Sequence, residues 1–382
     1  MKLVVLYTFL FLFLVSCGNE KNKVGKNPEG QLVLVFEEQS SSSFFSDMVF
    51  GKMKVIPLET NEKSLVGNEY ELLLDSNHFF IFDKQQETIL RFSKSGKFLN
   101  SIGRLGQGPS EYTYLSDYYI DDYAEIVEIL NPHGQILRYN YDGTFISKHN
   151  DEIFPASVVS FVKTGTNYWF NIGIVQEANE GQLIKKANDG IVTEKFLPVK
   201  TNWPLPFGIV RNFTQCGDIT TFREYISHTV YHITDDGPIE AVFFDFGKYG
   251  IPKGVFEGDF PQVLDDWVEK GSAIIYNFLE NERYIYTFFQ ILKNEEIIGN
   301  YHWILNKNSG NNVLQKFSSD DPIYQMLEGA KVITADNELV FMADAQILKT
   351  CTDPFFSNAN RIGNSLVKDA NPVIIHLKIN NF

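Results

Sequence analysis

Four glycine-containing dipeptides recur at a fixed spacing, and this repeat constrains the fold more than any other feature of the sequence. Consecutive glycines in the pairs lie 47 residues apart. The pairs are Ser95-Gly96, Asp142-Gly143, Asp189-Gly190 and Asp236-Gly237. Asp-Gly between apolar runs is typical of a two-residue β-turn, because glycine accepts the positive φ that such turns require. The repeat therefore predicts a series of similar units, each containing a hairpin.

The residues around these turns repeat as well. Residues 89–92 (ILRF) align without gaps to residues 136–139 (ILRY), and residues 79–82 and 126–129 supply a further strand in the same two units. Each unit thus holds about four short strands. The 33 Phe and 18 Tyr residues agree with this, since flat, stiff side chains suit a pleated, half-buried surface.

The second half of the chain departs from the strict register. A fifth turn, Ser309-Gly310, comes 73 residues after Gly237, so an insertion must lie between them. Within it, residues 259–270 (DFPQVLDDWVEK) are predicted to form a helix, because Asp259 can cap it and its apolar residues share one face.

The last unit contains strands at Glu338–Met342 and Val373–Ile379, and it lacks an outer strand. Either Gln31–Glu38 or Met53–Leu58 can supply that strand, which brings the chain ends together and leaves no open sheet edge. Four strands per unit at this spacing are typical of a β-propeller blade. We therefore predict an all-β, six-bladed β-propeller over residues 31–382. A pair of β-sandwiches or two separate β domains is the alternative.

The N-terminus has the parts of a secretory signal. Lys2 is followed by the apolar run Leu3–Val15, which is too short to span a bilayer, and then by Ser16-Cys17-Gly18. The string LVSC also resembles the bacterial lipobox, which implies cleavage before Cys17 and its acylation. We expect residues 1–16 to be a lipoprotein signal peptide and residues 17–30 a flexible tether; an ordinary signal peptide is the alternative.

The charge of the chain limits its partners. A formal net charge of -15 works against nucleic acid, whose recognition depends on clustered Lys and Arg, and any membrane association would have to come through the lipid. Only Cys216 and Cys351 remain after processing. Their spacing favours two separate thiols over a disulfide.

Two stretches carry a family resemblance. PLETNEKSLVG and the later FSKSGKFLNSIGRLGQGPSEY resemble the six-bladed β-propeller lipoproteins of Bacteroidota over roughly residues 50–382. The most specific part is Gly106–Pro109 with Glu111 and Tyr112. The resemblance implies an NHL-like propeller behind a lipoprotein signal, and it brings no established activity or catalytic residues.

The loop Gly103–Tyr112 (GRLGQGPSEY) is the first candidate site. Its glycines match neither GxGxxG nor a P-loop, so we do not expect a nucleotide. It is predicted to cross from the outer strand of one blade to the inner strand of the next, where glycines fit a crowded passage. Such crossings lie with the second-to-third strand loops on one face, where four side chains could converge on a ligand: Arg104, Gln107, Glu111 and His133.

A second candidate is the long crossing Phe196–Phe213, which carries Trp203 and Arg211. Long irregular loops on a rigid scaffold often hold binding groups, although a lid packed over the blade edges is an equal alternative. His228 and His232 lie four residues apart with no third ligand evident, so no metal is predicted. No catalytic motif or cofactor signature is present.

These features predict a lipid-anchored protein of the cell envelope, with the outer membrane as its expected location and its side of that membrane left open. We expect a non-catalytic binding module for a glycan, a peptide or a partner protein. A carbohydrate-active hydrolase or lyase, with acids from different blades, is one alternative. An architectural subunit of an envelope complex is another.

Overall fold

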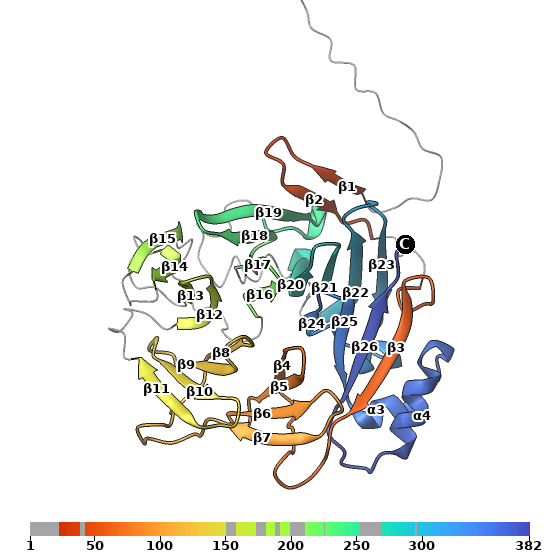
Figure 1. Cartoon of the computed structure of the whole chain (residues 1–382). Helices are drawn as coiled ribbons and strands as arrows, with labels where there is room; N and C mark the ends of the chain where they lie inside the picture. Colours follow the sequence, from red (N-terminus) through yellow and green to blue (C-terminus); the bar gives the residue numbers. More distant parts are fainter. Residues whose placement is uncertain are drawn as a thin grey trace, which may run out of the picture.

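Six antiparallel sheets surround a central axis in the computed structural model, as Figure 1 shows. The structure describes residues 23–38, 43–149, 158–172, 181–187, 192–198, 211–224, 226–252, 267, 269–294 and 296–382. Each sheet contains one blade of four antiparallel strands ordered from the axis outward, and the strand nearest the axis is its inner strand. In one sheet, two N-terminal strands extend the blade at its outer edge. The predicted six-bladed β-propeller is therefore confirmed.

The blades are numbered in chain order, and their strands are given from inner to outer. Blades one and two are β4 (Tyr70–Leu74), β5 (His78–Asp83), β6 (Thr88–Ser93) and β7 (Phe98–Ile102), then β8 (Asp117–Asp121), β9 (Ile126–Leu130), β10 (Ile136–Asn140) and β11 (Phe145–His149). Blades three and four are β12 (Val158–Thr164), β13 (Asn167–Ile172), β14 (Gly181–Ala187) and β15 (Val192–Pro198), then β16 (Phe213–Cys216), β17 (Ile219–Phe222), β18 (Thr229–Thr234) and β19 (Gly237–Asp245). Blades five and six are β20 (Ser272–Glu280), β21 (Tyr284–Lys293), β22 (Glu296–Asn306) and β23 (Asn312–Phe317), then β24 (Val332–Ile333), β25 (Glu338–Ala343), β26 (Val373–Ile379) and β3 (Phe50–Pro57).

The hairpin turns between third and fourth strands follow the predicted register. Gly96 and Gly143 have φ of +84° and +88°, and Gly237 and Gly310 also have positive φ. Gly190 lies outside the described residues. The positive φ explains why glycine recurs at these positions, since a side chain there would strain the backbone.

The ring is closed by an N-terminal strand. β3 pairs antiparallel with β26, with Met53 opposite Leu377, so the last blade combines both ends of the chain (Figure 1). Of the two predicted candidates, Met53–Leu58 thus supplies the missing strand. The other, Gln31–Glu38, contains β2 (Leu32–Val35), which pairs in parallel with β19 at the outer edge of blade four.

Part of the segment expected to be a flexible tether, residues 17–30, forms a strand. Residues Lys23–Lys26 form β1, which pairs antiparallel with β2. The physical reason is that β2, once paired with the outer edge of β19, has a free edge of its own that accepts a further strand. Of the expected tether 17–30, residues 17–22 lie outside the described part of the chain.

Burial along the strands reflects the stacking of the blades. The second strand of blade one, HFFIFD, has five fully buried residues in succession, whereas the outer strands β7 and β11 alternate with exposed residues. Both faces of a middle strand pack against neighbouring blades, so these strands need apolar side chains on both faces. The core between blades one and two includes Phe80, Tyr118 and Tyr139.

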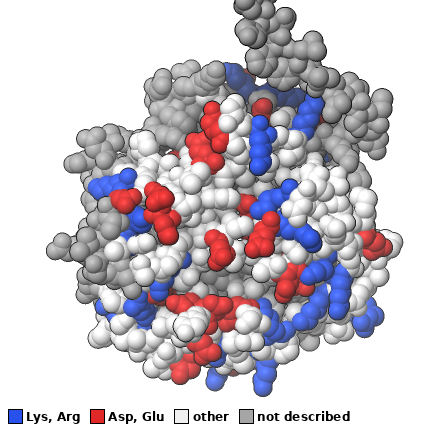
Figure 2. Space-filling model, turned by 45° about the horizontal axis from the view of Figure 1, so that its top comes forward, with Lys and Arg blue, Asp and Glu red and all other residues white. Residues whose placement is uncertain are grey.

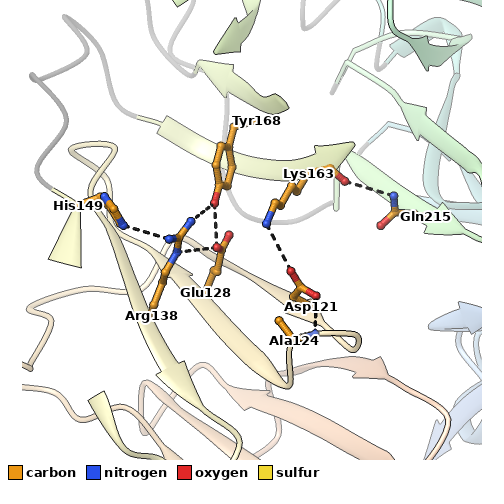
Figure 3. A network of polar contacts seen from close by, with 8 residues as sticks. All are labelled: Asp121, Ala124, Glu128, Arg138, His149, Lys163, Tyr168 and Gln215. Atoms are coloured by element: carbon orange, nitrogen blue, oxygen red, sulfur yellow. Dashed lines mark hydrogen bonds and ion pairs between the residues drawn. The ribbon is translucent and has the colours of Figure 1, made fainter. Parts of the chain in front are cut away.

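Polar contacts also join neighbouring blades, as Figure 3 shows. The buried carboxylate of Glu128 on β9 accepts hydrogen bonds from Arg138 Nε (2.8 Å) and from the hydroxyl of Tyr168 on β13 (2.8 Å). Lys163 Nζ lies 3.4 Å from Asp121 Oδ2 across the same seam. These contacts fix blades two and three relative to each other.

Short helices lie outside the blades. They are η1 (Gly247–Tyr249), α2 (Pro322–Met326), α3 (Ala345–Thr350), η3 (Pro354–Phe356) and α4 (Ser357–Ser365). The last three form an insertion between β25 and β26, and α3 and α4 lie beside β3 in Figure 1. Of the predicted helix 259–270, the structure describes residues 267, 269 and 270, all helical. No helix in the described residues is both long and apolar enough to cross a membrane.

Candidate functional site

The crossings between blades and the loops between second and third strands emerge on one face of the ring, because neighbouring strands in each blade run in opposite directions. A cavity of about 280 Å³ opens there, at the mouth of the central channel. Residues from blades one, two and three and from the crossings that lead into blades one, two and four line it: Glu69, Glu71, Phe82, Lys84, Glu87, Tyr114, Leu115, Ser116, Asp117, Val159, Ser160, Arg211 and Asn212. Acidic and basic side chains are interspersed over the face turned toward the viewer in Figure 2.

Arg211 joins three parts of this cavity. It lies two residues before β16, and its Nη2 donates a hydrogen bond of 3.2 Å to the carbonyl of Tyr118. Its guanidinium lies 3.6 Å from Asp117 Oδ1 and 3.9 Å from Glu71 Oε2. Glu71 in turn lies 2.8 Å from Lys84 Nζ. One arginine therefore holds acids from blades one and two together at the start of blade four.

The pKa values of the two acids are shifted in opposite directions. Burial raises the pKa of Asp117 to about 6, even though Arg211 acts in the opposite direction. Burial also acts on Glu71, but the charges of Arg211 and Lys84 outweigh it and hold the pKa of Glu71 below its ordinary value. The carboxylate of Asp117 accepts backbone hydrogen bonds from Tyr118 (2.8 Å) and Phe161 (3.0 Å). As the pH falls, Asp117 therefore takes up a proton before Glu71 does.

A second cavity of about 130 Å³ lies among the inner strands, and Arg211 borders it as well. Its walls are mostly apolar, with Leu73, Phe161 and Ile333 among them, and Lys331 is one of its few charged residues. Burial lowers the pKa of Lys331. The side chain of Arg211 thus borders both cavities, the charged one at the channel mouth and the mostly apolar one among the inner strands.

The glycine-rich loop Gly103–Tyr112 is the predicted crossing from β7 to β8. Its charges are largely satisfied within the loop, because Glu111 accepts a hydrogen bond from Gly108 N (2.8 Å) and lies 3.6 Å from Arg104 Nε. Gly103 has φ of +74°, and a Cβ there would come within 2.6 Å of Tyr112 Cε1. The glycines therefore serve the tight passage.

The other predicted residues lie in different places. Gln107 and His133 are exposed and do not line either cavity. Arg104 and Glu111 contact each other but also lie outside the cavity walls. Of the predicted site residues within the described part of the chain, Arg211 alone borders the cavities. Trp203 and Cys17 lie outside the described residues.

The remaining candidates have structural partners. The His228 ring lies 3.0 Å from the Ala273 carbonyl, and His232 lies 2.8 Å from Glu280 Oε2. Within the described residues, no group of three or more His, Cys, Asp or Glu side chains is placed to hold a metal ion. Cys216 and Cys351 are both free thiols.

Sequence reasoning missed most of the cavity. Glu71, Lys84 and Asp117 sit in ordinary strand or turn positions, and their proximity depends on how blades stack. The available signal was weak: Asp117 begins the strand after the glycine-rich crossing, where a buried acid is unusual.

A family model described as a domain of unknown function (DUF4934) matches residues 33–378. The chain belongs to this family. No curated protein matches the DUF4934 chain in sequence.

Two solved structures are similar to this DUF4934 protein. A protein of Bacteroides fragilis whose name describes it as exported has a TM-score of 0.75 at 18% identity, with 91% of this chain and 100% of that chain covered. A member of the DUF4221 family from Bacteroides vulgatus has a TM-score of 0.52 at 11% identity, with 87% and 97% covered. At these identities the likeness extends to the fold.

Proposed function

We propose that this protein is a lipid-anchored binding module of the cell envelope, attached to the outer membrane through Cys17, and that its cavity at the channel mouth takes part of a glycan, peptide or partner protein. The signal-like N-terminus and the lipobox-like LVSC string support the anchor. The similarity to a Bacteroides protein named as exported agrees with this location.

The observation that carries the binding proposal is the convergence of side chains from three blades and from the crossing into blade four on one open cavity around Arg211. A concave site with a few oriented polar groups on a rigid scaffold is the usual form of a ligand site. The closed ring holds these groups in place, because β3 completes blade six and each blade packs against a neighbour on either side.

A binding screen tests the proposal. The full chain, purified in detergent, is screened against envelope glycans, dietary polysaccharides, peptides and captured envelope proteins. A ligand is expected, and Tyr114→Ala should weaken its binding, because Tyr114 is a half-exposed residue of the cavity wall. Arg104→Ala, on the same face but outside the cavity, is the matched control. Absence of binding in all four groups would contradict the proposal.

Two further measurements test the anchor. Intact mass of the membrane form should show a lipid on Cys17, and Cys17→Ala should release the protein from the membrane fraction. An unmodified Cys17 in the membrane form would contradict lipidation.

One observation favours a second function, a carbohydrate-active hydrolase or lyase. Glu71 and Asp117 come from different blades and their pKa values are displaced in opposite directions, which is how paired acids divide acid and base roles. Release of new sugar ends from a polysaccharide by the wild type, abolished in both Glu71→Gln and Asp117→Asn, would support it. If the protein binds the polysaccharide but releases no new sugar ends, the result supports the non-catalytic binding function.

A further inference from the structure

The cavity at the channel mouth has an excess of acids, and its two cations are already engaged. Its wall contains Glu69, Glu71, Glu87 and Asp117 against Lys84 and Arg211. Lys84 pairs with Glu71 at 2.8 Å, while Arg211 lies between Glu71 and Asp117. An anionic ligand would therefore have to displace a carboxylate to reach either cation.

Glu87 stands out among these acids because of its backbone. Its φ is +47°, a left-handed conformation that favours glycine or asparagine. The corresponding turns between second and third strands use Gly134 (φ +79°) in blade two and Asn294 (φ +51°) in blade five. Blade one places a glutamate where other blades place the residues that suit the turn. A residue held in this conformation is a candidate for a functional side chain, to be judged by what surrounds it.

The side chain of Glu87 also lacks a partner. Its Oε2 is buried and has no hydrogen-bond partner among the described residues. Burial raises the pKa of Glu87, and no nearby cation opposes that shift. Its backbone is fixed from the other side, because the Tyr112 hydroxyl donates a 2.6 Å hydrogen bond to the Glu87 carbonyl. A positively charged group in the cavity would be attracted to this carboxylate, which belongs to the cavity wall.

Aromatic rings stand in the same wall. Tyr114 is 52% exposed, and Phe82 lines the cavity beside the Glu87 turn. Aromatic faces attract organic cations, and they add to the attraction of a carboxylate at the same site. Phosphate and sulfate gain nothing from such rings, whereas ammonium and guanidinium groups do.

We propose that the cavity binds the amine or guanidine group of a cationic ligand, with Glu87 as the carboxylate that receives it and Tyr114 as the aromatic contact. This inference rests on the proposed binding function and narrows its ligand class. The cationic group can be carried by a lysine or arginine side chain of a peptide or by a free polyamine.

Calorimetric titration of the full chain in detergent tests the inference. The probes are a blocked tripeptide with central lysine, the same tripeptide with central norleucine or glutamate, spermidine, and a neutral oligosaccharide. Glu87→Gln keeps the shape of the side chain and removes its charge. Glu125→Gln is the matched control, because Glu125 also has positive φ (+53°) but is exposed in a first-to-second strand loop on the opposite face.

The lysyl peptide or spermidine should bind the wild type, and Glu87→Gln should weaken that binding by about tenfold while Glu125→Gln leaves it unchanged. Binding of one but not the other identifies the source of the amine. If the norleucyl peptide, the glutamyl peptide or the oligosaccharide binds as tightly as the lysyl peptide, or if Glu87→Gln binds the amine as the wild type does, the inference is overturned and the binding function stands. If none of these probes binds, the inference is overturned, and the binding function is decided separately by the screen of all four ligand groups.

Discussion

Two crossings on the same face of the propeller use their charged residues in opposite ways. In the crossing Gly103–Tyr112, Glu111 binds a backbone amide of its own loop and lies close to Arg104. In the crossing that ends before β16, Arg211 reaches acids on blades one and two. The charged residues of the first crossing stabilise their own loop, while the second crossing contributes a side chain to a site built from several blades. A conspicuous loop sequence is therefore a weaker indication of a binding site than a charge whose partners lie on other blades.

Removing each arginine gives the largest expected contrast. Arg211→Ala leaves Glu71 and the buried Asp117 without their shared cation, and we expect a loss of about 3 kcal/mol in the free energy of unfolding at pH 8. Arg104 is 83% exposed, so Arg104→Ala should cost less than about 0.5 kcal/mol. Urea denaturation of both variants measures the difference. Equal losses would remove the distinction between the two crossings.

The next largest effect is the pH dependence that Asp117 gives to the free energy of unfolding. In the folded state the pKa of Asp117 is about 6, whereas the pKa of an Asp in the unfolded chain is about 3.8. Between these values the folded state binds more protons, so this group's contribution to stability is full below pH 4 and falls as the pH rises through 6. The decrease has an upper limit of about 3 kcal/mol.

Asp117→Asn should lack this decrease. Unfolding free energies of wild type and variant, measured at each pH from 4 to 7, should differ by an amount that declines across that window. A difference that stays constant with pH would show that Asp117 titrates normally.

A substitution in the glycine-rich crossing should destabilise the fold because the added side chain has no room. Gly103→Ala adds a Cβ at positive φ against Tyr112 and Ile129, and we expect a loss of about 2 kcal/mol. Gly165→Ala is the matched control, because Gly165 also has positive φ (+53°) but nothing lies within 4 Å of the added Cβ. Thermal unfolding of the pair separates crowding from backbone strain. A smaller loss of stability for Gly103→Ala than for Gly165→Ala would contradict the close packing around Gly103.

The smallest expected effect concerns Glu111. Glu111→Ala removes the acceptor for Gly108 N and should cost about 1 kcal/mol without changing ligand binding. Chemical denaturation and the binding screen measure the two properties separately. Loss of binding in this variant would transfer a ligand role to the glycine-rich crossing.

The fold was largely predictable because its signals are local. Gly96 and Gly143 sit in turns that depend on four consecutive residues, so their spacing gave the blade register directly. The helices α3 and α4 were missed, because they interrupt blade six and leave only a gap between predicted strands. β1 was missed because Lys23–Lys26 becomes a strand only when the edge of blade four is beside it.

The cavity was largely unpredictable because its residues meet only through stacking of the blades. Arg211 was singled out by the length of its crossing, whereas Glu71 and Asp117 carried no local signal of their proximity. Glu87 could be found only from its φ and from the buried oxygen that lacks a partner. Both are properties of the folded ring.

The pairing of β3 with β26 also sets an order of events during biosynthesis. Residues 50–57 leave the ribosome early, yet their partner, residues 373–379, is the last strand to be made. Until then the N-terminal strand has no place in a sheet, and blade six cannot form. A product truncated before residue 373 would keep an unpaired strand and an open ring, and it should be recognised by proteases as incomplete. A closed ring can thus form only once synthesis has passed residue 379.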